Sequence, residues 1–408
     1  MELSIIIPIY NTDTGHLKKC LESITNSTLT LSGVDYEVLL IDSGSTKDYV
    51  EYAKSYNARL IKTENRGIFA ARMLGVEYAR GKYCAFCDSD DTVSYDYHLP
   101  MLKSAVSEDA DIVINGWANH TPHARYYPVG DETLCKNIDL SNERIIKKFF
   151  EYKGRYHSFY VLWNKLYKSS LLYKSIRVAY EHIGERRLSY AEDVLINFFL
   201  FKEAKRLINI HTGYYFYRIH PSQSVNATDE KRICSQADDM AFVLEIMEKH
   251  LHSTALFSHL CEWRILVASH HIDNARQRGL GYLIPQIKAL YGIEGDIPKI
   301  KEIPCAVCLL PSNFQEIDES LFTIKSAGRP IRVGYSGSEH YTLSKLKQLS
   351  EEGAAIISKK DAEAVVPKEK YSFMERLLLD PFIYKISLHL FKKGSKMRAF
   401  LKKLISKP

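Results

Sequence analysis

The pattern of roughly the first 115 residues predicts an α/β fold, with a mostly parallel sheet flanked by helices. Short apolar runs alternate there with stretches whose apolar residues recur at helical spacing. The runs are nearly continuous and rich in β-branched residues, as in strands that are buried on both faces. Strands that alternate with helices form a mostly parallel sheet with right-handed crossovers. A helical and mixed C-terminal region is expected from residue 226 onward.

The elements are predicted in the following order. Strands are expected at residues 3–9, 36–41, 58–61, 83–87 and 111–115. Leu17, Cys20, Leu21 and Ile24 give the stretch after the first strand one apolar face, so it should be helical. A second helix is predicted from Gly67 to Ala79. Its expected buried residues are Phe69, Met73, Val76 and Tyr78.

Polar residues follow three of these strands. The run Tyr83–Cys87 ends in Asp88–Asp91, which holds three carboxylates within four residues. Asp42 follows the second strand, and Asn11 follows the first. Ligands bind at the carboxyl ends of the strands in open parallel sheets. Oxygen ligands suit Mg²⁺ or Mn²⁺, which leave positions for water and substrate phosphates. A solvated turn rich in Asp and Ser is the alternative interpretation.

In their order and in their separation along the chain, these motifs resemble those of family 2 glycosyltransferases. They are Ile6–Asn11, Ile41–Ser45, Glu64–Gly67 with Arg72, and Asp88–Asp91. The resemblance continues at Trp163–Tyr167, at Ala191–Asp193 and, more loosely, at Tyr217–His220. It implies a GT-A (Rossmann-like) fold. It also implies sugar transfer from a nucleotide diphosphate donor with inversion at the anomeric carbon.

The resemblance implies a UDP-sugar site with a divalent cation. The implied donor-binding residues are Pro8, Tyr10, Asn11, Asp42, Asn65, Gly67, Arg72, Asp88 and Ser89. Asp42 would accept a hydrogen bond from the uracil base, Arg72 would lie near the diphosphate, and Asp88 would meet the ribose. The implied ligands of Mg²⁺ or Mn²⁺ are Asp90, Asp91 and His220. The alternative interpretations are a turn-forming Asp42, a solvated helix arginine at position 72 and a structural histidine at position 220.

Sugar transfer also needs a base, because an alcohol is a poor nucleophile. The resemblance makes Asp193 this base and Glu192 its helper or a contact to the acceptor. Acidic residues are favoured in the first turn of a helix, so simple helix capping is the alternative interpretation. An acceptor-binding wall is expected from Trp163, Asn164 and Lys165, with buried tryptophan packing as the alternative.

Four regions are expected along the chain. They are a catalytic domain at 1–225, a helical region at 226–297, a small mixed α/β accessory module at 298–368 and a basic amphipathic tail at 369–408. From Tyr371 onward nine basic residues stand against two acidic ones, whereas the rest of the chain carries 46 basic and 47 acidic residues. Apolar residues recur in this tail at helical intervals. Such a helix binds a membrane interface with anionic lipids, and docking on a protein is the alternative.

The composition sets the expected location and partners. A net charge of +6 on 408 residues is too mild to indicate nucleic acid. No apolar run reaches the ~18 residues of a transmembrane helix, and no signal peptide is expected. Eight scattered cysteines fit reduced thiols. We therefore expect a cytoplasmic enzyme that contacts the inner face of the cell membrane.

The expected function is transfer of the donor sugar to a glycan or a lipid-linked acceptor in bacterial surface polysaccharide synthesis. Two alternatives share the fold. One is a catalytically degenerate scaffold that binds nucleotide sugars at the membrane. The other is a nucleotidyltransferase, in which Asp193 would have no role as a base.

Overall fold

The computed structural model describes residues 1–120, 125–128, 137–152, 157–219, 229–251, 253–293, 302–309, 321–326, 329–342 and 355–356. The chain divides into two compact units. The first consists of Met1–Ala118 and Asp131–Lys299, and the second of Asn119–Gly130 and Ile300–Pro408. His220 and the basic tail at 369–408 lie outside the described residues.

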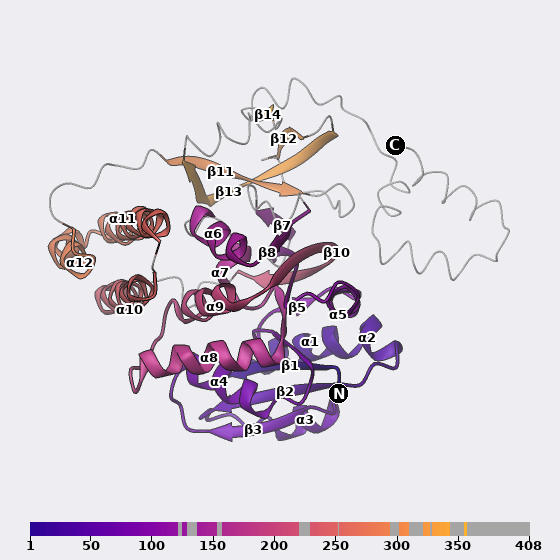
Figure 1. Cartoon of the computed structure of the whole chain (residues 1–408). Coiled ribbons are helices and arrows are strands. Elements are labelled where there is room, and N and C mark those ends of the chain that lie inside the picture. The colour runs from indigo at the N-terminus through magenta and orange to yellow at the C-terminus, as the bar shows by residue number, and fades with distance from the viewer. Residues whose placement is uncertain are drawn as a thin grey trace. The chain divides into compact units, whose positions relative to one another are not determined.

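Four parallel strands form one end of the sheet of the first unit (Figure 1). Their order is β3 (Arg59–Thr63), β2 (Tyr36–Ser43), β1 (Leu3–Ile9) and β4 (Tyr83–Phe86). The sheet continues through β9 (Lys165–Lys168), which is antiparallel to both β4 and β6 (Ile112–His120). The predicted α/β fold with a mostly parallel sheet is confirmed. Ile9 pairs with Asp42, so β1 and β2 end side by side.

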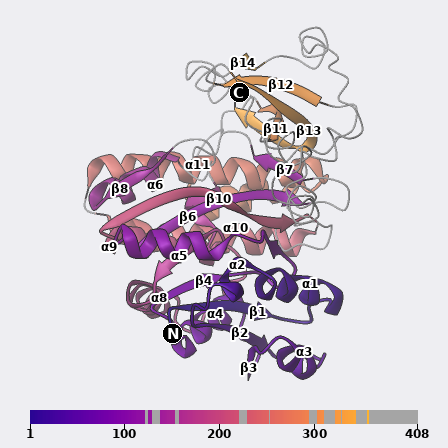
Figure 2. The same cartoon turned by 90° about the vertical axis from the view of Figure 1, so that its right-hand side faces the viewer.

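The remaining strands of this unit are short, apart from β10 (Arg206–Arg218). That strand pairs with β5 (Thr92–Val93), β6 and β8 (Asp139–Ser141), and Figure 2 shows it beside β6. The helices are α1 (Thr14–Thr25), α2 (Thr28–Leu31), α3 (Val50–Ser55), α4 (Ile68–Tyr78), α5 (His98–Ser107), α6 (Glu143–Tyr152), α7 (His157–Tyr160), α8 (Ser169–Ile183), α9 (Glu192–Glu203), α10 (Glu230–Lys249), α11 (Thr254–Gln277) and α12 (Ile284–Leu290), with a 3₁₀ turn at Gly281–Leu283.

Two apolar cores lie on the two faces of the sheet. Successive side chains of a strand point to opposite faces, and β1 shows this alternation. Ile5 and Ile7 belong to the core that includes the buried face of α1, whereas Ile6 belongs to the core with α4, α9 and α10. The continuous apolar run of β1 therefore follows from burial on both sides, as the sequence predicted.

Two sequence expectations need correction. Lys165 was expected only as part of an acceptor wall, and no strand was predicted there, yet Lys165–Lys168 forms β9 between β4 and the predicted fifth strand. Tyr78 was expected to be buried but is 47% exposed. Phe69, Met73 and Val76 share one face of α4, and at 3.6 residues per turn position 78 falls on the opposite face.

The second unit contains an antiparallel sheet. Its strands are β7 (Arg125–Pro128), β11 (Glu302–Leu309), β13 (Arg329–Thr342), β12 (Leu321–Ser326) and β14 (Ala355–Ile356), in that order. Across the described parts of both units, no helix has the length and apolar content needed to cross a bilayer.

Candidate active site

A buried guanidinium joins the two acidic groups that are far apart in the sequence. Arg72, on α4, is only 5% exposed. Its Nη2 donates to Asp88 Oδ1 at 3.2 Å, and its Nη1 donates to Glu192 Oε1. Asp88 follows β4, and Glu192 begins α9. The structure thus brings the predicted donor side and the predicted base side together around one cation. Contact of Arg72 with a diphosphate stays a prediction.

Asp193 sits in the first turn of α9, where Val194 N–H donates to its Oδ1 at 2.8 Å. Burial raises the pKa of Asp193 to about 7, the Glu192 carboxylate adds to this rise, and the Arg72 cation opposes it. A carboxyl group with a pKa near neutrality can accept a proton at physiological pH. The backbone enters α9 through Ala191, whose φ of 63° lies in the left-handed region.

The Asp88–Asp91 turn is fixed by the end of β10. The Tyr215 hydroxyl accepts a hydrogen bond from Asp88 N–H at 2.9 Å and donates to Asp91 Oδ2 at 2.7 Å. Arg218 N–H donates to Asp91 Oδ1 at 2.6 Å, and Arg218 Nε donates to the Asp90 carbonyl at 2.7 Å. Tyr215 is not among the residues predicted from the sequence, although the nearby Tyr217–His220 motif could have pointed to this strand.

The turn can accommodate a divalent cation through Asp88 and Asp90. The Asp88 side chain is 28% exposed and Asp90 is half-buried, whereas Asp91 is buried and accepts hydrogen bonds at both oxygens. Burial raises the pKa of Asp88, Arg72 opposes this, and Asp90 adds to it, so a cation would relieve the surplus negative charge. Mg²⁺ needs only one or two carboxylates beside substrate phosphates. No group of three metal-ligating side chains occurs among the described residues.

The loops that follow β1 and β2 are tied together. Asn11 Oδ1 accepts from Thr46 N–H and Oγ1 at 2.9 Å each, and Asn11 N–H donates to Ser45 Oγ at 2.9 Å. Asp42 Oδ1 accepts from Ser45 N–H at 3.0 Å, so this carboxylate does shape a turn. Pro8 is buried and Tyr10 is 56% exposed. Recognition of uracil by this group stays a prediction.

The other expected donor residues also connect strand ends. Ser89 Oγ shares a hydrogen bond with Thr12 Oγ1 at 2.7 Å, which links the loops after β4 and β1. Asn65 Oδ1 accepts from Gly67 N–H at 3.2 Å and from Arg187 Nη2 at 2.8 Å. Asn65 and Gly67 thereby connect the start of α4 to the segment that precedes α9.

The three expected acceptor residues lie inside the protein. Trp163 is 5% exposed and stacks on Tyr215 and Tyr217, with ring centroids 4.4 and 5.5 Å apart. Asn164 and Lys165 are at most 1% exposed, and Lys165 Nζ donates to Asn164 Oδ1 at 2.9 Å. The structure therefore gives these residues a supporting place behind the site. Tyr217 is half-buried, and burial together with the carboxylates of the Asp88–Asp91 turn raises its pKa.

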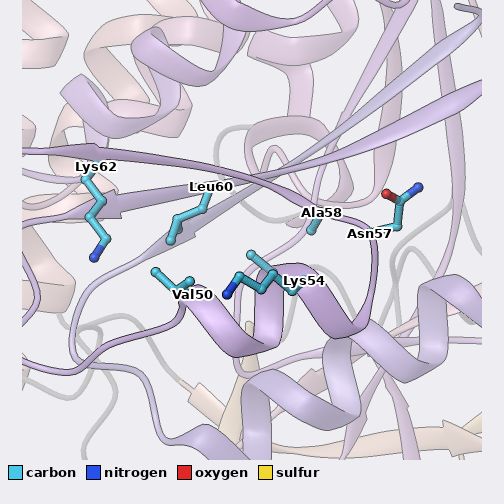
Figure 3. A pocket seen from close by; sticks show the side chains of 7 residues that line it. Val50, Lys54, Asn57, Ala58, Leu60 and Lys62 are labelled. Carbon is cyan, nitrogen blue, oxygen red and sulfur yellow. The ribbon is translucent and has the colours of Figure 1, made fainter.

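A separate cavity of about 730 Å³ lies between α3 and β3 (Figure 3). It is lined by Val50, Ala53, Lys54, Asn57, Ala58, Leu60 and Lys62. None of these residues belongs to the predicted site, so this cavity is not part of the arrangement around Arg72.

Known proteins share this sequence pattern. The family model described as "Glycosyl transferase family 2" matches residues 4–174. The EpsH protein of Bacillus subtilis, which bears the name of a glycosyltransferase, is 34% identical over 239 residues, covering 56% of this chain and 64% of EpsH. The glycosyltransferase GlyA of Streptococcus pneumoniae is 26% identical over 337 residues, covering 80% of this chain and 46% of GlyA. The chain thus spans less than two thirds of these relatives.

A solved structure is also similar. The crystal structure of residues 1–349 of TarS from S. aureus matches with a TM-score of 0.44 and 18% identity. The match covers 72% of this chain and 87% of that chain.

Proposed function

We propose, from the premise that this chain belongs to glycosyl transferase family 2, that it moves a sugar from a nucleotide diphosphate donor to an acceptor hydroxyl with inversion. One observation carries the proposal. Arg72 contacts Asp88 and Glu192 at once, so the acids at the end of β4 and the acids at the start of α9 can act on one substrate.

The proposed reaction is a single displacement. Asp193 accepts the proton of the acceptor hydroxyl while the oxygen of that hydroxyl attacks the anomeric carbon. The bond from that carbon to the diphosphate oxygen breaks, and the nucleoside diphosphate leaves. Arg72 holds Glu192 beside the base and Asp88 on the donor side of the site. Burial and the negative charge of Glu192 together raise the pKa of Asp193, so that this carboxylate can accept a proton near neutral pH.

The proposed cation is Mg²⁺ or Mn²⁺, held by Asp88 and Asp90. When bound, it would neutralise charge on the departing diphosphate. Asp91 is fixed through both oxygens by Tyr215 and Arg218, so it also orients the turn that carries Asp90. His220, the third expected ligand, lies outside the described residues.

We further propose a UDP-sugar as the donor and a glycan or lipid-linked acceptor at the inner face of the bacterial membrane. The buried Asp42, at the end of β2, supports the choice of uracil because its carboxylate sits beside the loop of Asn11. The basic tail supports membrane contact through its composition, although it lies outside the described residues.

The test is an assay of UDP release from a panel of UDP-sugars, with Mg²⁺ or Mn²⁺, for the wild type and Asp193→Asn. The wild type should turn over at least one donor. Asp193→Asn keeps the shape of the side chain but cannot accept the proton, so its kcat should fall about 10²- to 10⁴-fold. Its affinity for UDP, measured by calorimetry, should remain.

Two outcomes would contradict the proposal. A scaffold without catalysis would bind UDP and give the same background release in both proteins. A nucleotidyltransferase would consume a nucleoside triphosphate and release pyrophosphate, and Asp193→Asn would leave that rate unchanged.

A further inference from the structure

We propose that Asp239, on α10, is a positioning residue for the candidate base Asp193. This inference rests on the proposed sugar transfer. Asp239 lies beyond residues 4–174, which match the family model, and beyond the region that the sequence motifs cover. It acts through the entry segment, Arg186–Ala191, which leads directly into α9.

Asp239 holds the entry segment through three hydrogen bonds. Its side chain is buried, with the residue 4% exposed. Oδ2 accepts from the backbone N–H and from the hydroxyl of Ser189, both at 2.9 Å. Oδ1 accepts from Arg186 Nη2 at 3.1 Å. Hydrogen bonds to an ionised group are stronger than those between neutral groups, so Asp239 is a firm anchor close to the start of α9.

The entry segment also contacts the residues that lead into α4. Arg187 Nη2 donates to Asn65 Oδ1 at 2.8 Å. Gly67 has a φ of +91°, and a Cβ there would lie 3.2 Å from Arg187 Cγ and 3.5 Å from the Leu188 carbonyl oxygen. The entry segment is therefore held between α10 and the helix that carries Arg72.

The backbone at the end of the entry segment needs such support. Ala191 has φ 63° and ψ 12°, a left-handed conformation that residues with a Cβ rarely adopt. Strained backbone persists only where its surroundings hold it in place. The next two residues are Glu192, which pairs with Arg72, and Asp193. If the bonds to Asp239 are lost, Ala191 can relax, and the Asp193 carboxylate shifts relative to the acceptor hydroxyl.

The experiment compares Asp239→Ala, Asp239→Asn and Asp238→Ala in the full chain. Asp238 is the matched control: it is the preceding residue on α10, its Oδ2 accepts from the same Arg186 Nη2 at 2.6 Å, and its side chain is 52% exposed. The kcat and the donor KM are measured by UDP release, per folded molecule. The folded fraction comes from thermal unfolding followed by circular dichroism.

Asp239→Ala should lower kcat about 10- to 100-fold, because a shift near 1 Å in a reacting group has an effect of this size. The donor KM should change by no more than about twofold, since the nucleotide is expected at Asp88 and Asp90, and Asp238→Ala should leave kcat within about twofold. Asp239→Asn keeps one acceptor oxygen for Ser189, so it should recover part of the lost rate. If Asp239→Ala does not fold, Asp239→Asn and Ser189→Ala still test the inference through their kcat values.

The inference is wrong if kcat per folded molecule stays within about twofold of wild type in the Asp239 variants. It is also wrong if kcat and donor KM change together, or if Asp238→Ala has the same effect as Asp239→Ala. None of these results contradicts the proposed function if the wild type is active and Asp193→Asn is inactive. An inactive wild type would instead overturn the proposed function.

Discussion

Asp193 and Glu192 are neighbours in the chain, yet their side chains have different surroundings. Glu192 is buried and paired with Arg72, whereas Asp193 accepts a hydrogen bond from Val194 N–H and is half-buried. One carboxylate is thereby paired with a cation, and the other has a raised pKa. This division lets one residue fix the geometry while its neighbour exchanges a proton.

The pH dependence of the rate should report on Asp193. Its pKa is raised to about 7 by burial and by Glu192, against the lowering effect of Arg72 and Lys165. A base must be deprotonated, so kcat/KM should be constant above this pH and fall about tenfold per unit below it. The measurement is UDP release between pH 5.5 and 8.5 at saturating metal. A flat profile for the wild type, with stable protein throughout, would exclude Asp193 as the base.

The two acids at the end of the Asp88–Asp91 turn should differ in their effect on metal activation. Asp90→Asn should raise the Mn²⁺ concentration for half-maximal rate by at least about tenfold, because it weakens a ligand. Asp91→Asn should lower the free energy of unfolding by about 1–3 kcal/mol, because one buried hydrogen-bond donor, the Tyr215 hydroxyl or the Arg218 N–H, then lacks an acceptor.

Metal titration of the rate and urea unfolding separate the two effects. The half-maximal Mn²⁺ concentration of Asp91→Asn should stay within about twofold of wild type. An increase as large as that of Asp90→Asn would show instead that Asp91 is a ligand.

At the scale of elements, α4 positions Arg72 by packing tightly on the sheet. A Cβ on Gly75 would lie 2.3 Å from Ile6 Cγ2 and 3.2 Å from Ile41 Cγ1. Gly75→Ala should therefore lower the free energy of unfolding by about 1–3 kcal/mol. It should also lower kcat, because the added methyl group would displace α4 and Arg72 would move with this helix. Urea unfolding and UDP release measure the two effects.

Gly281→Ala serves as the control for this substitution. A Cβ there would meet only Ile284 Cδ1, at 4.0 Å. Its free energy of unfolding should stay within about 0.5 kcal/mol of wild type. Equal losses of stability in the two variants would mean that the contact of α4 with β1 does not decide the effect of Gly75→Ala.

The elements show what the sequence could and could not predict. The strands β1, β2 and β4 were predictable because each contains a short apolar run, as burial on both faces requires. The four-residue strand β9 was not, because Lys165–Lys168 has no apolar run and depends on pairing with β4 and β6. The candidate site divides in the same way. Asp88 and Asp193 belong to local motifs, whereas Asp239 and Tyr215 contribute through contacts between distant segments that a motif does not record.

At the scale of the whole molecule, the tail at 369–408 carries the prediction about location. Reversing three charges, Lys392→Glu, Lys393→Glu and Lys396→Glu, should weaken binding to vesicles that contain phosphatidylglycerol by about 100-fold, at ~1 kcal/mol per basic residue. Co-sedimentation measures the binding. The matched control reverses three exposed lysines on helices of the first unit, Lys19, Lys103 and Lys231. Equal losses in the two variants, or no binding by the wild type, would contradict membrane contact through the tail.

The path of the chain leaves one strand without its partner during synthesis. Asn119–Gly130 leaves the first unit for the second and then returns, and β7 in this excursion pairs with β11, which comes from the far end of the sequence. A ribosome therefore releases β7 long before its partner exists. Until then one edge of that strand offers unmatched amide and carbonyl groups to any extended peptide nearby. The nascent protein passes through a vulnerable interval that ends only when about three quarters of the message has been translated.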